Sequence, residues 1–326
     1  MAPPSQEAPV ADTPSQRPIK RFSASIVSVP IFVAMLVDET TRTFAIVNAV
    51  AQLTLFLVVA CLPAWRTLRM SYVDIAWPWG LTVLGVQVLV LGELSPFTAV
   101  IACFYLVVGG RMGLAALTLW RAGEFDKELP RYRFQRLRWK RTSLGSERVD
   151  LVAEVLVQGW ANCTVLAVPA ALAVSADKPA FSAVTAAGFV LWACAWALES
   201  TADMQKLRFG AASAKAGVKR SCDAGLWKYS RHPNYFFQWL QWTAVVVMCL
   251  PELVDHFGRT NLYSAALLAF GLVGCSVSMY WCLVSYTGAI PAEYYSVQKR
   301  PDYRDYQART NMFFPGPART PSRTAR

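Results

Sequence analysis

The run FTAVIACFYLVVGGRMGLAALTLW, Phe97–Trp120, decides the fold class of this chain. It carries a single charged residue, Arg111, and it exceeds the roughly 18 apolar residues that indicate a membrane-spanning helix. Six further apolar runs share this character: Phe44–Leu62, Tyr72–Leu91, Leu151–Val174, Phe181–Ala202, Tyr235–Leu250 and Leu262–Tyr286. The sequence therefore predicts an all-α, polytopic membrane helix bundle of about seven transmembrane helices.

An eighth apolar run, Phe22–Val37, is short and contains Pro30, so it either crosses as an eighth span or lies in the membrane interface. Residues 1–21 are rich in Pro, Ser, Ala and Gln, which predicts a disordered tail. Residues 316–326 form a basic C-terminal tail. No polar loop is long enough for a separate soluble domain, so residues 22–315 are expected to form one membrane domain.

Lysine and arginine are concentrated in alternate loops. The basic segments are Pro63–Ser71, Arg121–Asp150, Asp203–Asn234 and the tail after Tyr286. The segments poor in Lys and Arg are Gly92–Pro96, Ser175–Ala180 and Pro251–Asn261. The positive-inside rule then places the basic loops and the C-terminus in the cytosol. The net charge of +11 is carried largely by these loops, where it orients the chain in the membrane. We therefore expect membrane lipids but no nucleic acid among the partners.

Cysteine and histidine patterns exclude two kinds of site. The eight cysteines contain no CxxC pair, and most lie within or beside apolar runs, so neither a disulfide framework nor a zinc site is expected. The two histidines, His232 and His256, are too few for the histidine clusters of a membrane di-iron oxygenase. We therefore expect no metal.

The stretch SRHPNYF, Ser230–Phe236, places polar groups at the cytosolic mouth of the Tyr235–Leu250 span. Pro233 suits the first turn of a helix, and the free N–H groups there favour an anion. Arg231 adds a forked donor suited to phosphate or carboxylate. Its neighbours in the motif are His232, Asn234 and Tyr235. The motif indicates a site for a phosphate-bearing cofactor or, alternatively, a basic anchor at the membrane interface.

Two further motifs place carboxylates near membrane depth. In ESTADMQK, Glu199, Asp203 and Lys206 share one helical face, which suits either ligand orientation or an ion pair at the end of a span. In VDIAWPWG, Asp74 stands early in the second span, where it either serves a site or pairs with Arg66 or Arg69.

Arg111 lies inside its apolar run, so it needs an anionic partner. Asp74, Glu199 or a ligand phosphate would serve, and a purely structural ion pair remains the alternative. In the tail, Tyr303, Tyr306 and Arg309 form one face of a short helix. That face either stacks on a nucleotide base and grips phosphates or belongs to an amphipathic interfacial helix.

Four stretches together resemble a known family: GLWKYSRHPNYF (Gly225–Phe236), ESTADMQK (Glu199–Lys206), VDIAWPWG (Val73–Gly80) and IPAEYYSVQKRPDYRDYQARTNMFFP (Ile290–Pro315). They are similar to motifs of the DUF1295 proteins, a group within the steroid 5-alpha-reductase-like superfamily of membrane enzymes. The resemblance implies that residues 22–315 form a reductase-like domain. It also implies an NADPH-dependent reductase that acts on an activated C=C bond in a steroid-like or other lipid substrate.

The resemblance also implies where the cofactor and the reacting groups lie. NADPH is expected on the cytosolic side, with these residues around it: Arg111, Arg121, Asp203, Lys206, Arg231, His232, Asn234, Tyr235, Glu293, Tyr303, Tyr306 and Arg309. Steroid reductases pair a glutamate and a tyrosine at the substrate carbonyl. Here Asp74 stands in for the glutamate and Tyr105 for the tyrosine, with Glu199 as a further candidate proton donor. Tyr105 is farther from Arg111 than in that pattern, which leaves the identity of the lipid open.

The elements RHPxY and YxxY…P also resemble those of isoprenylcysteine carboxyl methyltransferases, which bind S-adenosylmethionine. An S-adenosylmethionine-dependent membrane methyltransferase is therefore the alternative function, and a non-catalytic membrane bundle is a third. The family resemblance implies an endoplasmic-reticulum membrane, although a bacterial inner membrane protein would have the same sequence features. Protein partners are not indicated.

Overall fold

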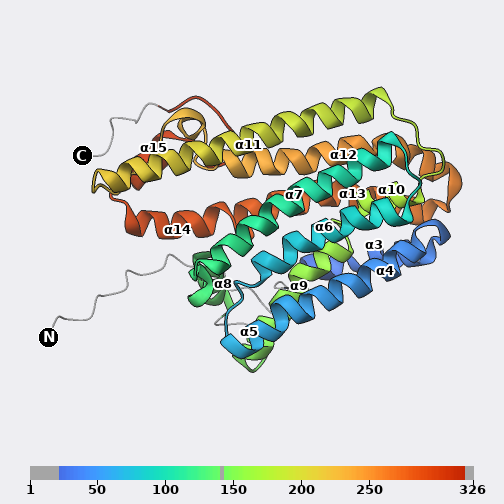
Figure 1. Ribbon diagram of the computed structural model, residues 1–326, viewed down its shortest axis with the longest axis horizontal. Helices are drawn as coiled ribbons and strands as arrows, with labels where there is room; N and C mark the ends of the chain where they lie inside the picture. Colours follow the sequence, from blue (N-terminus) through green and yellow to red (C-terminus); the bar gives the residue numbers. More distant parts are fainter. Residues whose placement is uncertain (1–21, 140–142, 320–326) are drawn as a thin grey trace.

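The computed structural model describes residues 22–139 and 143–319, and its elements form a bundle of long helices (Figure 1). The N-terminal half comprises α2 (Ser23–Val27), α3 (Val29–Val37), α4 (Glu39–Phe56), the π-helical turn η1 (Leu57–Cys61), α5 (Leu62–Thr67), α6 (Val73–Leu91), α7 (Pro96–Arg121), η2 (Glu124–Asp126), α8 (Pro130–Trp139) and α9 (Glu147–Cys163). The C-terminal half comprises α10 (Val168–Ser175), α11 (Ala183–Lys215), η3 (Gly225–Lys228), α12 (Pro233–Arg259), α13 (Leu262–Trp281), the π-helical turn η4 (Cys282–Tyr286), α14 (Ala289–Lys299) and α15 (Tyr303–Arg309).

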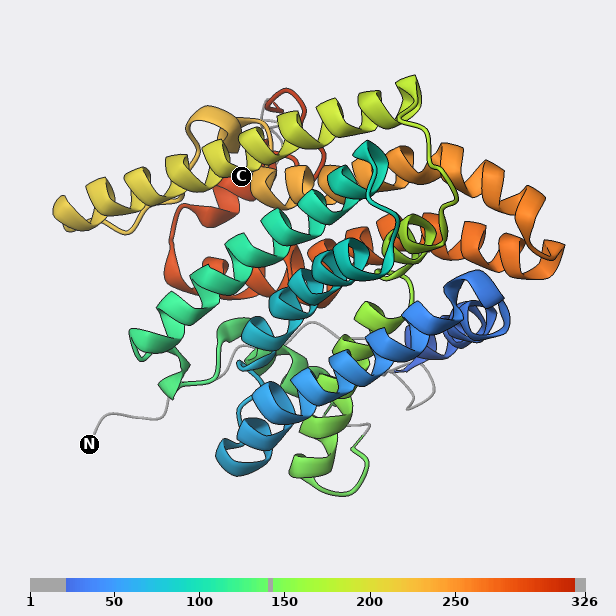
Figure 2. The same ribbon diagram turned by 45° about the vertical axis from the view of Figure 1, so that its right-hand side comes forward.

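The predicted all-α membrane bundle is confirmed for the part of the chain that the structure describes. Seven helical runs are long and apolar enough to cross a membrane: Glu39–Thr67, Val73–Leu91, Pro96–Arg121, Glu147–Ser175, Ala183–Lys215, Pro233–Arg259 and Leu262–Lys299. Figures 1 and 2 both show α11 and α12 side by side along the length of the bundle. Seven helices of this kind make the chain an integral membrane protein. The predicted N-terminal tail, residues 1–21, lies outside the described residues, as do residues 320–326 of the predicted C-terminal tail 316–326.

Several predicted span boundaries are wrong because hydropathy marks only the part of a helix at membrane depth. Pro251–Asn261 was expected as a loop, but α12 continues through Pro251 to Arg259. Similarly, α11 continues to Lys215, beyond the apolar part of the run. Polar residues at the interface still form intrahelical hydrogen bonds, so the helix ends later than the apolar run. In contrast, the predicted Leu151–Val174 span is interrupted after Cys163, and α10 restarts with Pro169 in its first turn.

The segment Phe22–Val37 forms two short helices of 5 and 9 residues, fewer than the roughly 20 residues that a full crossing requires. One face of α3 is buried, with Ile31 1% and Met35 0% exposed, whereas Val29, Val33 and Val37 on it are exposed. The buried face packs between α4 and α13, and α2 contributes to the wall of a cavity described below. Its position relative to the membrane interface stays a prediction.

Buried amides support α6 where Pro78 interrupts its hydrogen-bond ladder. Asn162 Nδ2 donates to the carbonyl of Trp77 at 3.2 Å, and Gln52 Nε2 donates to the carbonyl of Gly80 at 2.9 Å. Pro78 takes the donor from the Asp74 carbonyl, four residues earlier, so the amide contacts at Trp77 and Gly80 are additional hydrogen bonds between helices on either side of the proline. The amides thereby fix α6, which carries Asp74, against α4 and α9.

Gly109 allows α7 to approach α6 closely, and it supports a first prediction. A Cβ atom at Gly109 would lie 2.6 Å from the Pro78 carbonyl oxygen, whereas one at Gly110 meets no atom within 4 Å. Gly109→Ala should therefore force α6 and α7 apart and destabilise the protein by about 1–3 kcal/mol. Gly110→Ala is the matched control and should leave the unfolding temperature in detergent unchanged or slightly raised. Equal unfolding temperatures for the two variants would contradict this packing.

Candidate active site

Two cavities adjoin at the basic end of the bundle. The larger one, of about 430 Å³, lies between α6, α7, α9, α12 and α13 and has mostly apolar walls; we call it the bundle cavity. The smaller one, of about 280 Å³, lies between α8, α12 and α14 and is lined by Lys299 and Arg300 among others; we call it the basic vestibule. Arg131, Tyr235 and Thr287 line both. Two ligands, one in each cavity, could therefore meet at these three side chains.

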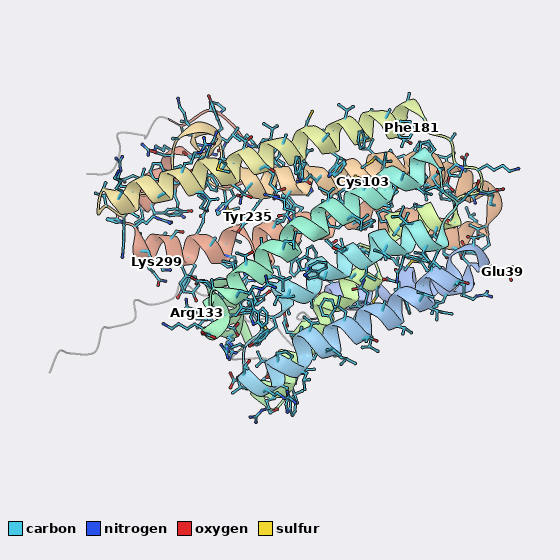
Figure 3. All side chains as sticks on the ribbon, in the orientation of Figure 1. Glu39, Cys103, Arg133, Phe181, Tyr235 and Lys299 are labelled. Atoms are coloured by element: carbon cyan, nitrogen blue, oxygen red, sulfur yellow. The ribbon has the colours of Figure 1, made fainter. Side chains whose placement is uncertain are left out.

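The labelled residues in Figure 3 give the position of this junction along the bundle. Arg133 and Lys299 lie at one end of the molecule, and Glu39 and Phe181 lie at the opposite end. Tyr235 stands between them, closer to the end with Lys299. The vestibule thus belongs to the basic end of the bundle, which the positive-inside rule assigns to the cytosol.

Asp74 forms a polar centre with two residues of α8. Arg131 Nη2 makes an ion pair with Asp74 Oδ2, and the hydroxyl of Tyr132 donates to Asp74 Oδ1 at 2.5 Å. All three residues line the bundle cavity. Burial, followed by the neighbouring Asp74 carboxylate, raises the pKa of Tyr132 well above its ordinary value, so the phenol keeps its proton. The cation opposite Asp74 is thus Arg131 and not Arg66 or Arg69.

Tyr132 is a candidate site residue that the sequence did not single out, and the same holds for Tyr286, Lys299 and Arg300. Tyr132 lies in the basic Arg121–Asp150 segment, where the abundance of arginines indicated only membrane orientation. Its contact with Asp74 joins residues 58 positions apart, and no helical or strand periodicity reports such a contact. The sequence offered one signal: the Tyr132 hydroxyl stands next to Arg131, just after Pro130, which can begin a helix.

The segment carrying Tyr132 is held at both ends by backbone contacts. Glu128, just before α8, accepts hydrogen bonds from the backbone N–H groups of Met70 and Ser71 at the start of α6, at 2.9 and 3.1 Å. Near the other end of α8, Gln135 donates to the Tyr286 carbonyl, and Arg138 Nη1 donates to the Ser285 carbonyl at 2.9 Å. A π-helical turn such as η4 widens the hydrogen-bond pattern and is frequent at functional sites. These contacts fix α8 between α6 and η4.

Two hydrogen-bond donors on residues that line the bundle cavity have no partner within the described residues. They are Arg131 Nε and the Tyr286 hydroxyl, and both atoms are themselves buried in the cavity wall. The Tyr286 ring is held by stacking on Trp281, with 4.9 Å between ring centroids. A buried donor left unpaired costs about 1–3 kcal/mol. An acceptor on a bound ligand reaches these two atoms only when their side chains turn toward the cavity.

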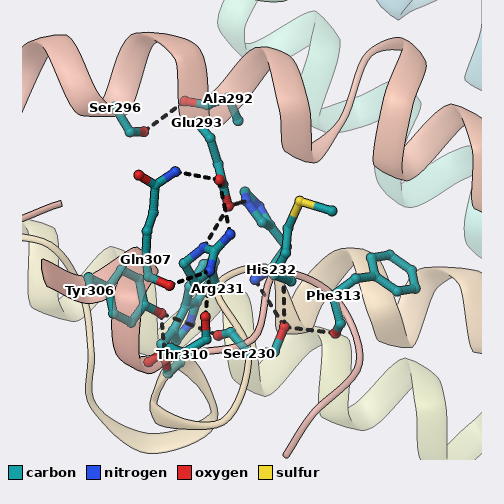
Figure 4. A network of polar contacts seen from close by, with 12 residues as sticks. Ser230, Arg231, His232, Ala292, Glu293, Ser296, Tyr306, Gln307, Thr310 and Phe313 are labelled. Atoms are coloured by element: carbon teal, nitrogen blue, oxygen red, sulfur yellow. Dashed lines mark hydrogen bonds and ion pairs between the residues drawn. The ribbon is translucent and has the colours of Figure 1, made fainter. Parts of the chain in front are cut away.

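The SRHPNYF motif forms a second polar centre, around Glu293 of α14 (Figure 4). Arg231 binds the Glu293 carboxylate with two donors, Nε at 2.7 Å and Nη2 at 3.1 Å. Its Nη1 donates to the backbone carbonyls of Gln307 and Thr310. His232 Nε2 and Gln307 Nε2 also contact Glu293, at 3.1 and 2.7 Å. The arginine therefore joins the start of α12 to α14, and its forked face is occupied by a carboxylate.

His232 supports a prediction for the pH dependence of stability. Burial lowers the pKa of His232 below its ordinary value of 6.5, and Glu293 only partly opposes this. The folded state therefore keeps the ring neutral at a pH where the unfolded chain already binds a proton. Stability should decrease as the pH falls from 6.5 through the lower folded-state pKa. In His232→Asn this decrease should be smaller than in the wild type, as unfolding temperatures between pH 7 and pH 5 would show. Parallel plots of unfolding temperature against pH for the two proteins would contradict this prediction.

Arg111 has the anionic partners that the sequence required. Its Nη1 lies 2.7 Å from Glu199 Oε1, and its Nη2 lies 2.6 Å from Asp203 Oδ2. Asn234 Nδ2 donates to the other oxygen of Asp203 at 3.0 Å, and Gln241 donates to Glu199. The structure thus brings these predicted site residues together between α7, α11 and α12, in an ion-paired cluster that does not line either cavity.

The other predicted residues lie apart from both cavities. Tyr105 is 0% exposed, and its hydroxyl donates to the Leu166 carbonyl behind the cavity wall. Tyr303 and Tyr306 are buried, and the Tyr306 hydroxyl donates to backbone carbonyls of the η3–Ser230 turn. The remaining three are dispersed on the basic side: Lys206 lies over the Trp227 ring, Arg309 pairs with Asp223, and Arg121 is exposed at the end of α7. Their assignment to a cofactor stays a prediction.

Comparison with known protein families agrees with this architecture. The family described as "Protein of unknown function (DUF1295)" matches residues 62–310, which is most of the chain. The chain belongs to the DUF1295 family. The match includes Asp74, Tyr132, Arg231 and Glu293 of this DUF1295 protein, so both polar centres lie inside the family region. No curated protein and no solved structure gives a match.

Proposed function

We propose that this protein is a membrane-embedded, NADPH-dependent reductase that acts on the activated C=C bond of a lipid. The observation that carries the proposal is the junction of the two cavities. An apolar cavity containing unpaired donors adjoins a basic vestibule at Arg131, Tyr235 and Thr287. The first suits a lipid with a carbonyl group, and the second suits a phosphate-bearing cofactor.

The residues of the vestibule fit such a cofactor. Among the described residues, the Arg300 guanidinium makes one hydrogen bond, of 3.3 Å to the Ser296 hydroxyl, and has no carboxylate partner, so most of its donors remain available. Lys299 is exposed beside it. In contrast, Arg111 and Arg231 are already paired with carboxylates. We therefore assign the phosphates to Lys299 and Arg300, with Tyr235 and Tyr295 as aromatic walls. When bound, NADPH supplies the hydride.

The bundle cavity provides the groups that the substrate needs. The carbonyl oxygen of the lipid accepts hydrogen bonds from Arg131 Nε and the Tyr286 hydroxyl. Both donors stabilise the negative charge that develops on this oxygen as the β-carbon gains hydride. The Tyr132 phenol then gives its proton to the α-carbon, and Asp74 orients that phenol. The Asp74 carboxylate opposes the phenolate that remains, and the Arg131 guanidinium, 5.6 Å from the centre of the ring, stabilises it.

The same proposal gives an orientation in the membrane. The vestibule opens at the basic end of the bundle, and cytosolic NADPH reaches it if that end faces the cytosol. We propose an endoplasmic-reticulum membrane as the location, in accordance with the sequence resemblance.

Nucleotide binding to the detergent-purified protein tests the proposal. Calorimetry should detect NADPH and not S-adenosylmethionine, and a Lys299→Gln, Arg300→Gln double variant should bind NADPH at least about tenfold more weakly. Arg304→Gln is the matched control, since Arg304 is exposed on α15 and lies outside both cavities. Binding of S-adenosylmethionine alone would make the protein a membrane methyltransferase. Binding of neither nucleotide would favour a non-catalytic bundle.

A further inference from the structure

The first turn of α6 is held by a carboxylate that lies just before α8. In this turn the N–H group of Asp74 donates to the Ser71 carbonyl at 3.1 Å. The N–H groups of Met70 and Ser71 then need other acceptors, as the first N–H groups of a helix do. The side chain at the N-cap of α6 supplies none. Glu128 accepts both, at 2.9 Å from Met70 N and 3.1 Å from Ser71 N. The start of α6 therefore depends on the segment that leads into α8.

Ser71 makes the corresponding contact in the opposite direction. Its hydroxyl donates to Glu128 Oε1 at 2.6 Å and accepts the backbone N–H of Leu129 at 3.0 Å. The Leu129 carbonyl in turn accepts the backbone N–H of Tyr132 at 3.0 Å, in the first turn of α8. Each helix thus begins at a turn that binds a side chain from the other. We call Ser71 and Glu128 the reciprocal cap.

A short series of hydrogen bonds therefore joins Asp74 to Tyr132 outside the cavities. It runs from Asp74 to Ser71, from Ser71 to Leu129 and from Leu129 to Tyr132. Neither Ser71 nor Glu128 lines the bundle cavity or the basic vestibule. Ser71 is 0% exposed and the Glu128 side chain 10%, so water competes little for these contacts. The reciprocal cap thus acts on α6 and α8 and not on a ligand.

Arg136 strengthens the reciprocal cap. Its Nη2 lies 2.9 Å from Glu128 Oε2 and also donates to the Leu68 carbonyl at the end of α5. Hydrogen bonds between a guanidinium and a carboxylate are roughly twice as strong as bonds between neutral groups. Gln135 and Arg138 hold the later part of α8 on η4. The first turn of α8, which carries Tyr132, is held on α6 by the reciprocal cap.

The contact between Tyr132 and Asp74 is short enough to be sensitive to the position of α8. The Tyr132 hydroxyl lies 2.5 Å from Asp74 Oδ1, and Arg131 binds the other oxygen of the same carboxylate. A displacement of about 1 Å in a reacting geometry can lower a rate by about 10²-fold. A loss of contacts at the start of α8 would allow such a displacement.

We propose that Ser71 and Glu128 are positioning residues for the reaction: they fix α8 against α6 and so hold the Tyr132 hydroxyl at Asp74 for proton transfer. This inference rests on the proposed function for the role of Tyr132 as proton donor. The effect of the reciprocal cap on the Tyr132 hydroxyl itself does not depend on that function.

Kinetics in two backgrounds test the positioning role. Ser71→Ala and Glu128→Gln should each lower kcat for enone reduction by about 10- to 100-fold while the affinity for NADPH stays the same. In the Tyr132→Phe background each should lose most of its effect on the residual kcat, because residues that act through one group are not additive. A merely structural role would lower kcat by the same factor in both backgrounds.

The matched control is Ser182→Ala. Ser182 is the N-cap of α11, where its hydroxyl oxygen accepts the Thr185 N–H at 3.1 Å, and it does not line either cavity. The variant loses a comparable helix cap, so its unfolding temperature should decrease about as much as that of Ser71→Ala. Its kcat should stay within about twofold of the wild type.

A titration of the Tyr132 hydroxyl tests the inference without any turnover. Burial, and then the Asp74 carboxylate, raise the pKa of Tyr132. With 3-fluorotyrosine in place of Tyr132, fluorine NMR of the full-length protein in detergent follows this ionisation. The phenol should ionise at a lower pH in Ser71→Ala than in the otherwise wild-type protein, and at an unchanged pH in Ser182→Ala.

The two experiments separate the inference from the proposed function. A lower ionisation pH in Ser71→Ala, in a protein that does not reduce enones, would refute the reductase and support the positioning of Tyr132. An unchanged ionisation pH, or full kcat in Ser71→Ala and Glu128→Gln, would overturn the inference and leave the reductase in place. An equal loss of kcat in both backgrounds would also overturn it.

Discussion

Replacing Tyr132 by phenylalanine should lower kcat for enone reduction by about 10²- to 10⁴-fold, the usual contribution of a positioned proton donor. The substitution removes only the hydroxyl that donates to Asp74, and the ring remains packed against Val73 and Leu151. The fold should therefore persist, with a cost of about 1 kcal/mol for the lost hydrogen bond. The measurement is the rate of NADPH oxidation with saturating enone, together with the unfolding temperature.

Tyr294→Phe is the matched control for this variant. Tyr294 also packs on α8, with its ring 5.2 Å from Phe134, but it does not line either cavity. The loss of the Tyr294 hydroxyl in this variant should leave kcat within about twofold of the wild type. A Tyr132→Phe enzyme that retains full kcat would show that Tyr132 is not the proton donor, and Asp74, which lines the same cavity, would become the candidate.

Replacing Glu293 by alanine should produce the largest loss of stability, about 3–5 kcal/mol, because it leaves the buried Arg231 charge without its partner. The side chains of Arg231 and Glu293 are only 10% and 11% exposed, so water does not compensate for the loss. His232 and Gln307 also lose a hydrogen-bond partner. The measurement is the free energy of unfolding in mixed micelles, with the exposed Glu124→Ala as control. A loss below about 1 kcal/mol would show that water penetrates this centre.

The Glu293 centre also explains why the SRHPNYF motif matters to a site that it only partly lines. Tyr235 faces both cavities, whereas Arg231 and His232 face Glu293. Through Glu293 they position α14, whose Pro291, Tyr295 and Ser296 form a wall of the vestibule. In the proposed arrangement the polar groups at the start of α12 position the vestibule wall, and the cofactor phosphates bind to Lys299 and Arg300 at the end of α14.

The sequence could predict features that depend on local composition. Apolar runs gave the seven spans, and the isolated charge of Arg111 required the carboxylate partners that it has in Glu199 and Asp203. The sequence could not predict contacts made by segments that composition classifies as loops. The position of α8 depends on Glu128 and on carbonyls of η4, and neither contact leaves a periodic pattern. The packing of one face of α3 against α4 and α13 could not be predicted, because a short apolar run is equally compatible with the membrane interface and with the protein core.

The transfer of deuterium from NADPH labelled at C4 tests the central proposal most directly. Purified protein is incubated with the labelled cofactor and a 3-oxo-4-ene lipid, and the product is analysed by mass spectrometry. We expect one deuterium at the former β-carbon of the reduced lipid, and no reduction by the Tyr132→Phe variant in the same time. An unreduced lipid in the presence of bound NADPH, or transfer of a methyl group from S-adenosylmethionine in a parallel incubation, would contradict the assignment of this protein as a reductase.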